Sequence, residues 1–347
     1  MRCGIVTVYN SENCGSYLQA YALKKFIEKE GNQAMFARQS FSDHSASRRK
    51  YFIKLTKMAL RGNRAGMKSL FDGRKNFQAS VARYLPVVQN TDGINCFILG
   101  SDTTWDVSIS FFRNHADFFW GTRYKDAKII SYAPSVGFSK AEHIENCGFI
   151  QDALSRMSAV SVRDETSKEL LQPYCNKEIQ IVCDPTYLLG KADYDAIAKP
   201  TDLKDFLFIY YYGKMPPDYK EAIQKFAKQK GLKTVTFGNA NPWCDVSLAY
   251  DPLLFLSIYN RADYIFTNTF HGTVFATIYE KRFAVIKNNK QKVLNVLKLC
   301  EMSDKMTNTA EDIQAILESE FCYEVTRKNI LRERETSIQY LRSAIEG

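Results

Sequence analysis

The stretch YIFTNTFHGTVFATIYEKRFAVI, residues 264–286, contains two short apolar runs with a helical pattern between them. The runs at 264–268 and 283–286 have the length of buried strands, and residues 271–280 have the spacing of a helix. A strand, a helix and a second strand in succession predict a βαβ unit and therefore a mainly parallel sheet. This stretch predicts the α/β fold class.

The same alternation covers most of the chain. Before residue 190, apolar runs lie at 3–9, 96–100, 127–133, 159–164 and 179–185, with helical patterns at 16–31 and 165–172. After a polar segment, further runs lie at 206–213 and 233–237, with a helical pattern at 218–230. We predict an N-terminal domain over 1–190, a C-terminal domain over 191–325, a hinge near 190–205, and a terminal helix over 326–347 that crosses back to the first domain.

Length and composition agree with two domains. A chain of 347 residues exceeds what one hydrophobic core usually organises, and 45% apolar with 24% charged residues is typical of a folded soluble protein. We find no run of eighteen apolar residues and no signal-peptide pattern at the N-terminus. We therefore expect a cytoplasmic protein. The nine cysteines include no CxxC pair and no Cys/His cluster, so we expect no metal site and no disulfide framework.

One segment carries the basic excess of the chain. Residues 44–85 hold eleven Lys and Arg against one acid, Asp72, which gives +10, whereas the whole chain has a net charge of +9. Part of this segment has the spacing of a basic amphipathic helix, with Phe52, Leu55, Met58 and Ala59 as its apolar positions. Such a helix suits an anionic membrane surface or a diphosphate-bearing ligand, and a solvated surface insert is an equal alternative. No nucleic-acid-binding motif accompanies the charge, so we expect no nucleic-acid partner.

Ligands of open parallel sheets bind beyond the carboxyl ends of the strands, which directs attention to four strand-to-helix junctions. At the first, YNSENCGSYLQ, the residues Asn10, Asn13 and Gly15 suit a turn that exposes backbone amides to an anion or a sugar hydroxyl. A simple helix cap is the alternative.

The second junction is CFILGSDTTWD. Asp102 follows Ser101 at the end of a strand and suits a general base, and Trp105 suits stacking on a sugar face. The alternative is a helix cap beside a buried tryptophan. At the third junction, SVRDE, Arg163 suits a bidentate clamp on a carboxylate or phosphate, with a local ion pair as the alternative.

The fourth junction, NTFHGTVF, combines the most features. Asn268 or Thr269 can cap the helix, Gly272 permits close approach, and His271 lies in the first turn, where the helix dipole favours an anion. A bound phosphate or carboxylate would raise the proton affinity of this histidine. The alternative is a capped histidine that fills a gap in the core.

Taken in order, six segments resemble the polysaccharide pyruvyl transferase family over roughly residues 1–300. They are NSENCGSYLQAYAL, ILGSDTTWD, ISYAPSVG, VSVRDETSKELL, CDPTYLL and ADYIFTNTFHGTVFATIYEKRFAVI. The resemblance implies a GT-B-like architecture of two Rossmann-like domains facing across a cleft. It also implies transfer of the pyruvyl carbons of phosphoenolpyruvate to glycan hydroxyls as a ketal, with release of phosphate. Phosphoenolpyruvate is then the donor substrate, and no cofactor is expected.

The resemblance assigns roles to His271 and Arg163, and the chemistry of the four junctions suggests the roles of the other residues. His271 would act as phosphate ligand or acid/base and Asp102 as a second catalytic group. The donor would bind at Arg163, Asn268, Thr269, Gly272 and Thr273, and the acceptor in the N-terminal domain at Asn10, Asn13, Gly15, Ser101 and Trp105. Thr269 departs from the pattern, because some family members carry an arginine at that position.

In bacterial members the acceptor is often a sugar linked to polyprenyl diphosphate, in capsule or exopolysaccharide synthesis. The basic segment 44–85 would then lie at an anionic membrane surface, with the protein at its inner face. Two alternatives remain open. One is a GT-B glycosyltransferase that uses a nucleotide sugar, with Glu280 on the ribose; the other is a catalytically silent glycan-binding subunit.

Overall fold

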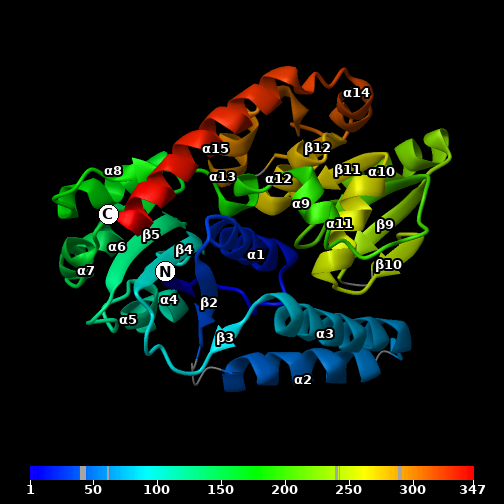
Figure 1. The fold of residues 1–347 in the computed structure, drawn as a ribbon. Coiled ribbons are helices and arrows are strands. Elements are labelled where there is room, and N and C mark those ends of the chain that lie inside the picture. Colours follow the sequence, from blue (N-terminus) through cyan, green and yellow to red (C-terminus); the bar gives the residue numbers. More distant parts are fainter. Residues whose placement is uncertain (40–43, 61, 239–240, 242, 288–290) are drawn as a thin grey trace. The chain divides into compact units, whose positions relative to one another are not determined.

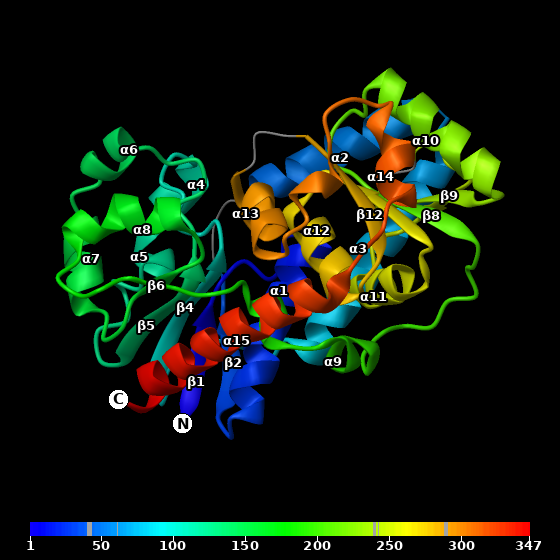
Figure 2. The same cartoon turned by 90° about the horizontal axis from the view of Figure 1, so that it is seen from above.

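The computed structural model describes residues 1–39, 44–60, 62–238, 241, 243–287 and 291–347, with the backbone alone for 44–50 and 54. The chain divides into two compact units. The first comprises residues 1–38, 81–190 and 329–347, and the second comprises residues 39–80 and 191–328. Each unit is a parallel sheet with helices packed around it (Figure 1, Figure 2).

The first unit contains a five-stranded parallel sheet in the order β3-β2-β1-β4-β5. Its strands are β1 (Arg2–Val6), β2 (Gln33–Ala37), β3 (Val87–Val88), β4 (Cys96–Asp102) and β5 (Lys128–Pro134). A parallel pair, β6 (Ser161–Val162) and β7 (Gln180–Ile181), continues it through a bridge between Ile130 and Ala159. The order reverses between β1 and β4, which makes this pair the topological switch point of the sheet.

Helices cover this sheet. Helix α1 (Cys14–Lys29) packs on β2 and β4, and the later part of α15 (Tyr323–Glu346) reaches β5, where the Tyr340 hydroxyl donates to the Ser131 carbonyl at 2.8 Å. The shorter elements are α4 (Ser110–Asn114), α5 (Ala116–Phe119), α6 (Ala141–Glu145), α7 (Ile150–Arg156), α8 (Glu165–Leu171), η1 (Gln172–Tyr174) and η2 (Pro185–Leu188).

The second unit repeats the design with six parallel strands in the order β10-β9-β8-β11-β12-β13. They are β8 (Phe206–Tyr210), β9 (Lys233–Phe237), β10 (Val246–Leu248), β11 (Tyr264–Thr267), β12 (Arg282–Ile286) and β13 (Met306–Thr307). Numbered within the unit, this is the 3-2-1-4-5-6 order of a Rossmann sheet, with its switch point between β8 and β11. Strands β8, β11 and β12 are almost fully buried, as their continuous apolar runs predict.

The helices of the second unit are α2 (His44–Leu60), α3 (Arg64–Tyr84, which continues into the first unit), α9 (Lys191–Asp195), α10 (Pro217–Lys230), α11 (Pro252–Arg261), α12 (Phe270–Ile278), α13 (Gln291–Leu299), η3 (Ser303–Lys305) and α14 (Asp312–Glu318). Helices α10 and α14 lie side by side and share one apolar core with the sheet (Figure 2). Ile223 of α10, Phe266 of β11 and Leu317 of α14 are fully buried there.

The α/β class and the parallel sheets are confirmed. The stretch 264–286 forms β11, α12 and β12, each within two residues of its predicted bounds. The basic segment differs from its prediction. It was placed in the N-terminal domain, but residues 39–80 pack with the second unit. Helix α3 approaches this unit closely, because a Cβ at Gly73 would lie only 3.0 Å from the Tyr250 backbone nitrogen.

Of the helices that the structure describes, none combines the length and the apolar character that a transmembrane span needs.

Candidate active site

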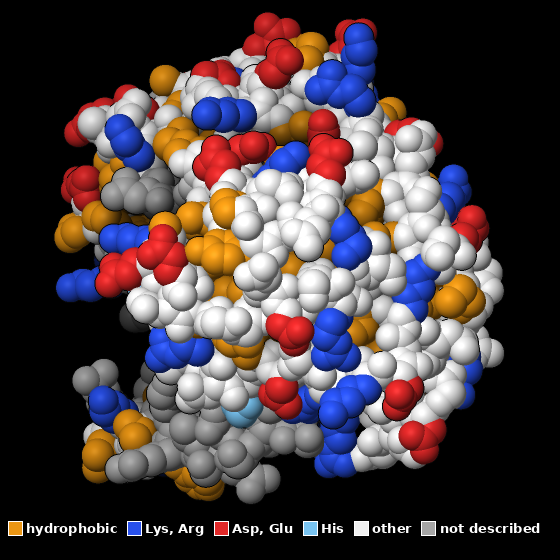
Figure 3. All heavy atoms as spheres, turned by 90° about the vertical axis from the view of Figure 1, so that its left-hand side faces the viewer, with side chains coloured by type: hydrophobic (Ala, Val, Ile, Leu, Met, Phe, Trp, Pro, Cys, Tyr) orange, Lys and Arg blue, Asp and Glu red, His pale blue; other side chains and the backbone are white. Residues whose placement is uncertain are grey.

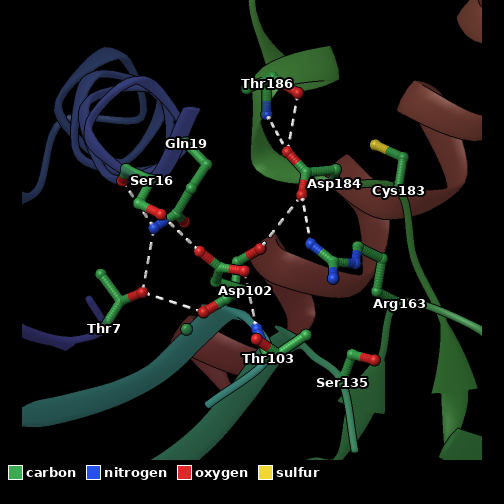
Figure 4. Close-up of polar contacts among 12 residues, drawn as sticks. Thr7, Ser16, Gln19, Asp102, Thr103, Ser135, Arg163, Cys183, Asp184 and Thr186 are labelled. Carbon is green, nitrogen blue, oxygen red and sulfur yellow. Dashed lines mark hydrogen bonds and ion pairs between the residues drawn. The ribbon is translucent and has the colours of Figure 1, made fainter. Parts of the chain in front are cut away.

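In the first unit, polar side chains connect the two strands of the switch point at their carboxyl ends (Figure 4). The Thr7 hydroxyl, just after β1, donates to the Ser101 carbonyl of β4 at 2.9 Å. The Gln19 side chain of α1 donates to Thr7 Oγ1 at 3.1 Å and to the Ser16 carbonyl at 2.9 Å. These contacts tie the start of α1 to the strand ends, so they fix where the first turn of the helix lies.

Asp102 ends β4 and is half-buried, and its carboxylate accepts a hydrogen bond of 2.7 Å from the Ser16 hydroxyl in the first turn of α1. Its backbone is left-handed, with φ +72°, and Ala133 at the end of the neighbouring strand has φ +57°. Left-handed backbone is uncommon at residues other than glycine and is found most often at functional sites. Asp102 therefore lies where a ligand of this sheet is expected, with a hydroxyl partner in place.

Arg163, just after β6, forms a buried ion pair. Its guanidinium lies 2.9 Å from Asp184 Oδ2, and the two side chains are 5% and 2% exposed. Burial by itself lowers the pKa of Arg163, but the carboxylates of Asp184, Asp102 and Asp164 outweigh it and raise that pKa above its ordinary value. Arg163 is therefore always cationic. The pairing favours the ion-pair alternative, and a direct contact with the donor stays a prediction.

Asp184 follows β7 and is held on several sides (Figure 4). Its Oδ1 accepts from the Thr186 amide at 3.1 Å and hydroxyl at 2.7 Å, and its Oδ2 accepts from the buried Ser101 hydroxyl at 3.4 Å. Sequence reasoning missed this residue as a member of the site. The available signal was its place in CDPTYLL, directly after a short apolar run.

The other acceptor-side predictions have mixed outcomes. Asn13 is the N-cap of α1, and its Oδ1 accepts from the amides of Gly15 at 2.9 Å and Ser16 at 3.3 Å. The cap alternative therefore describes Asn13 and Gly15, and Asn10 lies exposed just before them. Trp105 was expected to stack on a sugar, and that prediction is wrong. Its side chain is fully buried and stacks on Trp120 with ring centroids 4.3 Å apart.

In the second unit, Asn268 spans the switch point. Its side chain accepts from the Tyr212 amide at 2.9 Å and donates to the Tyr212 carbonyl at 2.8 Å. Tyr212 follows β8 and Asn268 follows β11, so this pair of bonds holds the two strand ends together beyond the sheet. The role of Asn268 in the structure is to fix the loop next to the first turn of α12.

The first turn of α12 is built by threonines. Thr269 is the N-cap, its Oγ1 accepts from the Gly272 amide at 2.9 Å, and the Thr273 hydroxyl donates to the Thr269 carbonyl at 3.0 Å. A Cβ at Gly272 would lie 2.2 Å from Thr267 Oγ1, so no side chain fits there. The predicted helix cap at Thr269 and the predicted close backbone approach at Gly272 are both found. Together they place His271 at the carboxyl edge of the sheet.

His271 is 9% exposed, and its ring meets the Phe270 ring edge-on at 4.9 Å between centroids. A cation lies beside the Phe270 ring, because Lys292 Nζ of α13 is 5.8 Å from the centroid of that ring. Sequence reasoning missed Lys292, since nothing in QKVLNVLKL relates it to a residue 21 positions earlier. It places a positive charge near the turn at which some family members carry an arginine in place of Thr269.

A cluster of tyrosines borders this edge. The hydroxyls of Tyr210 and Tyr212 lie 3.2 Å apart, and the Tyr250 hydroxyl lies 3.4 Å from that of Tyr212. Tyr212 is the exposed member of the three. Glu280, in contrast, follows the other end of α12 and pairs with Arg327 through both carboxylate oxygens at 2.8 Å. A role for Glu280 on a ribose at the His271 edge is therefore not supported.

Each of the two strand edges offers its own kind of chemical group. The first has a carboxylate that can take a proton from a hydroxyl, and the second has a helix N-terminus, a histidine and a lysine that suit a multiply charged anion. Among the described residues, no group of three His, Cys, Asp or Glu side chains is placed to hold a metal ion.

Solved structures similar to the chain include two UDP-GlcNAc 2-epimerases. The enzyme from Methanocaldococcus jannaschii shares 11% identity over all of both chains, with a TM-score of 0.54. The enzyme from Neisseria meningitidis, bound to UDP-GlcNAc, shares 10% identity over 99% of this chain and 100% of that one, with a TM-score of 0.51. Both have the GT-B fold, so the predicted GT-B-like architecture is confirmed.

Comparison with curated proteins found no match. The model of the polysaccharide pyruvyl transferase family, a family of transferases, matches residues 13–290. That span includes the switch point of the second unit and β4 of the first, but it leaves out β1, Thr7, Asn10 and Lys292. The chain belongs to the polysaccharide pyruvyl transferase family.

Proposed function

We propose that the protein transfers the pyruvyl group of phosphoenolpyruvate to two hydroxyls of one sugar in a glycan, forming a pyruvate ketal. C3 of the donor gains a proton while a sugar hydroxyl attacks C2. A second hydroxyl of the same sugar then displaces phosphate from C2. Of the two hydroxyl protons that leave, one balances the proton gained at C3 and the other leaves with inorganic phosphate as the C2–O bond to phosphate breaks.

The observation that carries the proposal is the first turn of α12. There the capped helix N-terminus, His271 and the nearby Lys292 gather at one strand edge, inside a chain matched by the family model. Phosphoenolpyruvate brings a phosphate and a carboxylate, and such groups bind at helix N-termini and beside lysine. Lys292 would supply the charge that Thr269 does not.

His271 would contact the phosphate and donate a proton as it departs. A phosphate bound to this side chain raises its affinity for a proton, so the donor itself would prepare the acid. Asp102 would be the base that deprotonates the attacking hydroxyl, and its bond from Ser16 keeps the carboxylate oriented. The Tyr212 ring offers an apolar face with a fixed hydroxyl, which suits a sugar or the donor's methylene carbon.

We further propose that the acceptor sugar is carried on a polyprenyl diphosphate and that the protein works at the inner face of the membrane, in capsule or exopolysaccharide synthesis. The support is the basic segment 44–85, because a cationic surface retains both anionic lipid and a diphosphate.

Phosphate release from phosphoenolpyruvate tests the reaction. We expect release only when a lipid-linked or soluble glycan acceptor is present, in equal amounts to the pyruvylated product. Transfer from a UDP-sugar, with no phosphate released from phosphoenolpyruvate, would instead identify a glycosyltransferase that uses a nucleotide sugar. Acceptor binding with no turnover of either donor would identify a glycan-binding subunit.

A further inference from the structure

Helices α2 and α3 carry an unusual concentration of exposed apolar side chains. Among the described residues, ten large hydrophobic side chains are exposed, and four of them lie between positions 52 and 71: Phe52 at 64%, Ile53 at 46%, Leu60 at 83% and Phe71 at 54%. Single exposed hydrophobic residues are normal on a protein surface. Four within twenty positions of one helical hairpin mark an interaction surface.

The exposed side chains of α2 share one face of the helix. Phe52, Thr56 and Leu60 lie four residues apart, and Ile53 and Lys57 lie beside them. The opposite face is the half-buried one, with Tyr51, whose ring meets that of Phe71 on α3 edge-on at 6.1 Å. The sequence groups Phe52 with Leu55, Met58 and Ala59 as the apolar positions of this helix. In the structure Leu55 and Met58 are half-buried, whereas Phe52 is exposed, so its apolar surface is available to a partner.

The same two helices carry several cations. Lys57, Arg64, Lys68 and Lys75 are exposed, and Arg74 lies over the Tyr51 ring at 4.8 Å from its centroid. Asp72 is the single acid of residues 44–85. On the face of the molecule in Figure 3, by comparison, the described acidic and basic side chains are interspersed, without an extended patch of one sign.

We infer that the described part of this hairpin, residues 51–60 and 62–75, is a docking surface for an anionic lipid bilayer. Aromatic and aliphatic side chains bind at the boundary between headgroups and acyl chains, while lysine and arginine bind anionic headgroups. The close contact of Gly73 with Tyr250 fixes the hairpin to the unit that holds His271. The inference deepens the proposed function, since a lipid-linked acceptor would be met at this surface, but bilayer binding needs no donor.

Vesicle flotation of the full chain tests it. We expect binding to vesicles of phosphatidylcholine with about one-third phosphatidylglycerol, little binding to phosphatidylcholine alone, and weaker binding as salt is raised. Phe52→Ser with Leu60→Ser should weaken binding about tenfold. The matched control is Phe138→Ser in the first unit, whose side chain is also 64% exposed and which should bind as the parent does.

Two triple variants distinguish the effect of the hairpin's own charge from the effect of the protein's net charge. Lys57→Glu/Lys68→Glu/Lys75→Glu should reduce the partition coefficient about a hundredfold, at roughly fivefold for each lysine removed. Lys204→Glu/Lys225→Glu/Lys228→Glu changes the net charge by the same amount on exposed positions of the second unit and should retain most of the binding. Thermal melting checks that all variants fold.

Equal loss in both triple variants, or equal binding to the two kinds of vesicle, would overturn the inference. So would a dimer that Phe52→Ser/Leu60→Ser disperses without any vesicle binding, because the surface would then belong to a second copy. A water-soluble acceptor keeps the two proposals apart, since transfer to it depends on the donor site and not on the bilayer.

Discussion

At the scale of single residues, the proposed reaction depends on the charged groups around the first turn of α12. His271 lies there between the Thr269 cap and Gly272, in a turn held by the hydroxyls of Thr269 and Thr273 and by the Tyr259 hydroxyl, which donates to the Gly272 carbonyl at 3.1 Å. We expect His271→Gln to reduce kcat about a hundredfold or more, because the phosphate loses its proton donor. The melting temperature should stay close to that of the parent. Near-parental turnover in this variant would remove His271 from the mechanism.

Lys292 has a separable role. It lies beside Phe270 rather than in the cap, so its contribution is charge. Lys292→Met should raise KM for phosphoenolpyruvate about tenfold to a hundredfold and leave KM for the acceptor unchanged. Lys298→Met, at an exposed position of the same helix, is the control for net charge. Equal KM values for phosphoenolpyruvate in the Lys292→Met and Lys298→Met variants would show that Lys292 does not bind the donor.

Arg163 and Asp184 behave as one buried unit. Because both side chains are almost fully buried, removing one leaves the other as an uncompensated charge. Arg163→Ala and Asp184→Ala should each lower the free energy of unfolding by about 3–5 kcal/mol, measured by urea denaturation. Replacing both, as Arg163→Met/Asp184→Leu, should recover much of that loss. An Arg163→Ala variant with full stability and a raised donor KM would identify a donor clamp instead.

At the scale of elements, α15 supports the loop that carries Asp184. The Cys183 amide donates to the Ser337 hydroxyl at 2.8 Å, and both residues are buried. Ser337→Ala would leave that buried amide without its acceptor and should cost about 1–3 kcal/mol in unfolding free energy. Activity should fall as well, because Asp184 holds Arg163 and Ser101. Thr336→Ala, at the adjacent exposed position, should change neither, and a similar effect of both variants would contradict this role for α15.

The sequence predicted elements well where a strand is one continuous apolar run. The stretch 264–286 shows this, because the apolar runs YIFT and RFAVI form strands that are buried in the sheet. Short edge strands such as β10, at Val246–Leu248, lacked that signal. Contacts between distant residues were also inaccessible. Neither the stacking of Trp105 on Trp120 nor the pairing of Arg163 with Asp184 follows from local spacing.

At the scale of the whole molecule, two units with the same strand order place their polar groups by the same rule. In each unit, the chain passes from the two central strands to neighbouring strands on opposite sides of that pair. A side chain connects the ends of the central strands. It is Thr7, which bonds to Ser101, in the first unit and Asn268, which bonds to Tyr212, in the second. The location of both edges could be predicted from the sequence, because parallel sheets bind ligands there. Lys292 could not, because only tertiary packing brings α13 beside α12.

The most direct test of the central claim is the mass of an acceptor glycan after incubation with carbon-13-labelled phosphoenolpyruvate. We predict a product that carries all three labelled carbons as a ketal, with one phosphate released for each ketal formed. The His271→Gln variant should form almost none of it. An unlabelled acceptor after incubation with the parent protein, or a product that forms only when a UDP-sugar is supplied, would contradict the account.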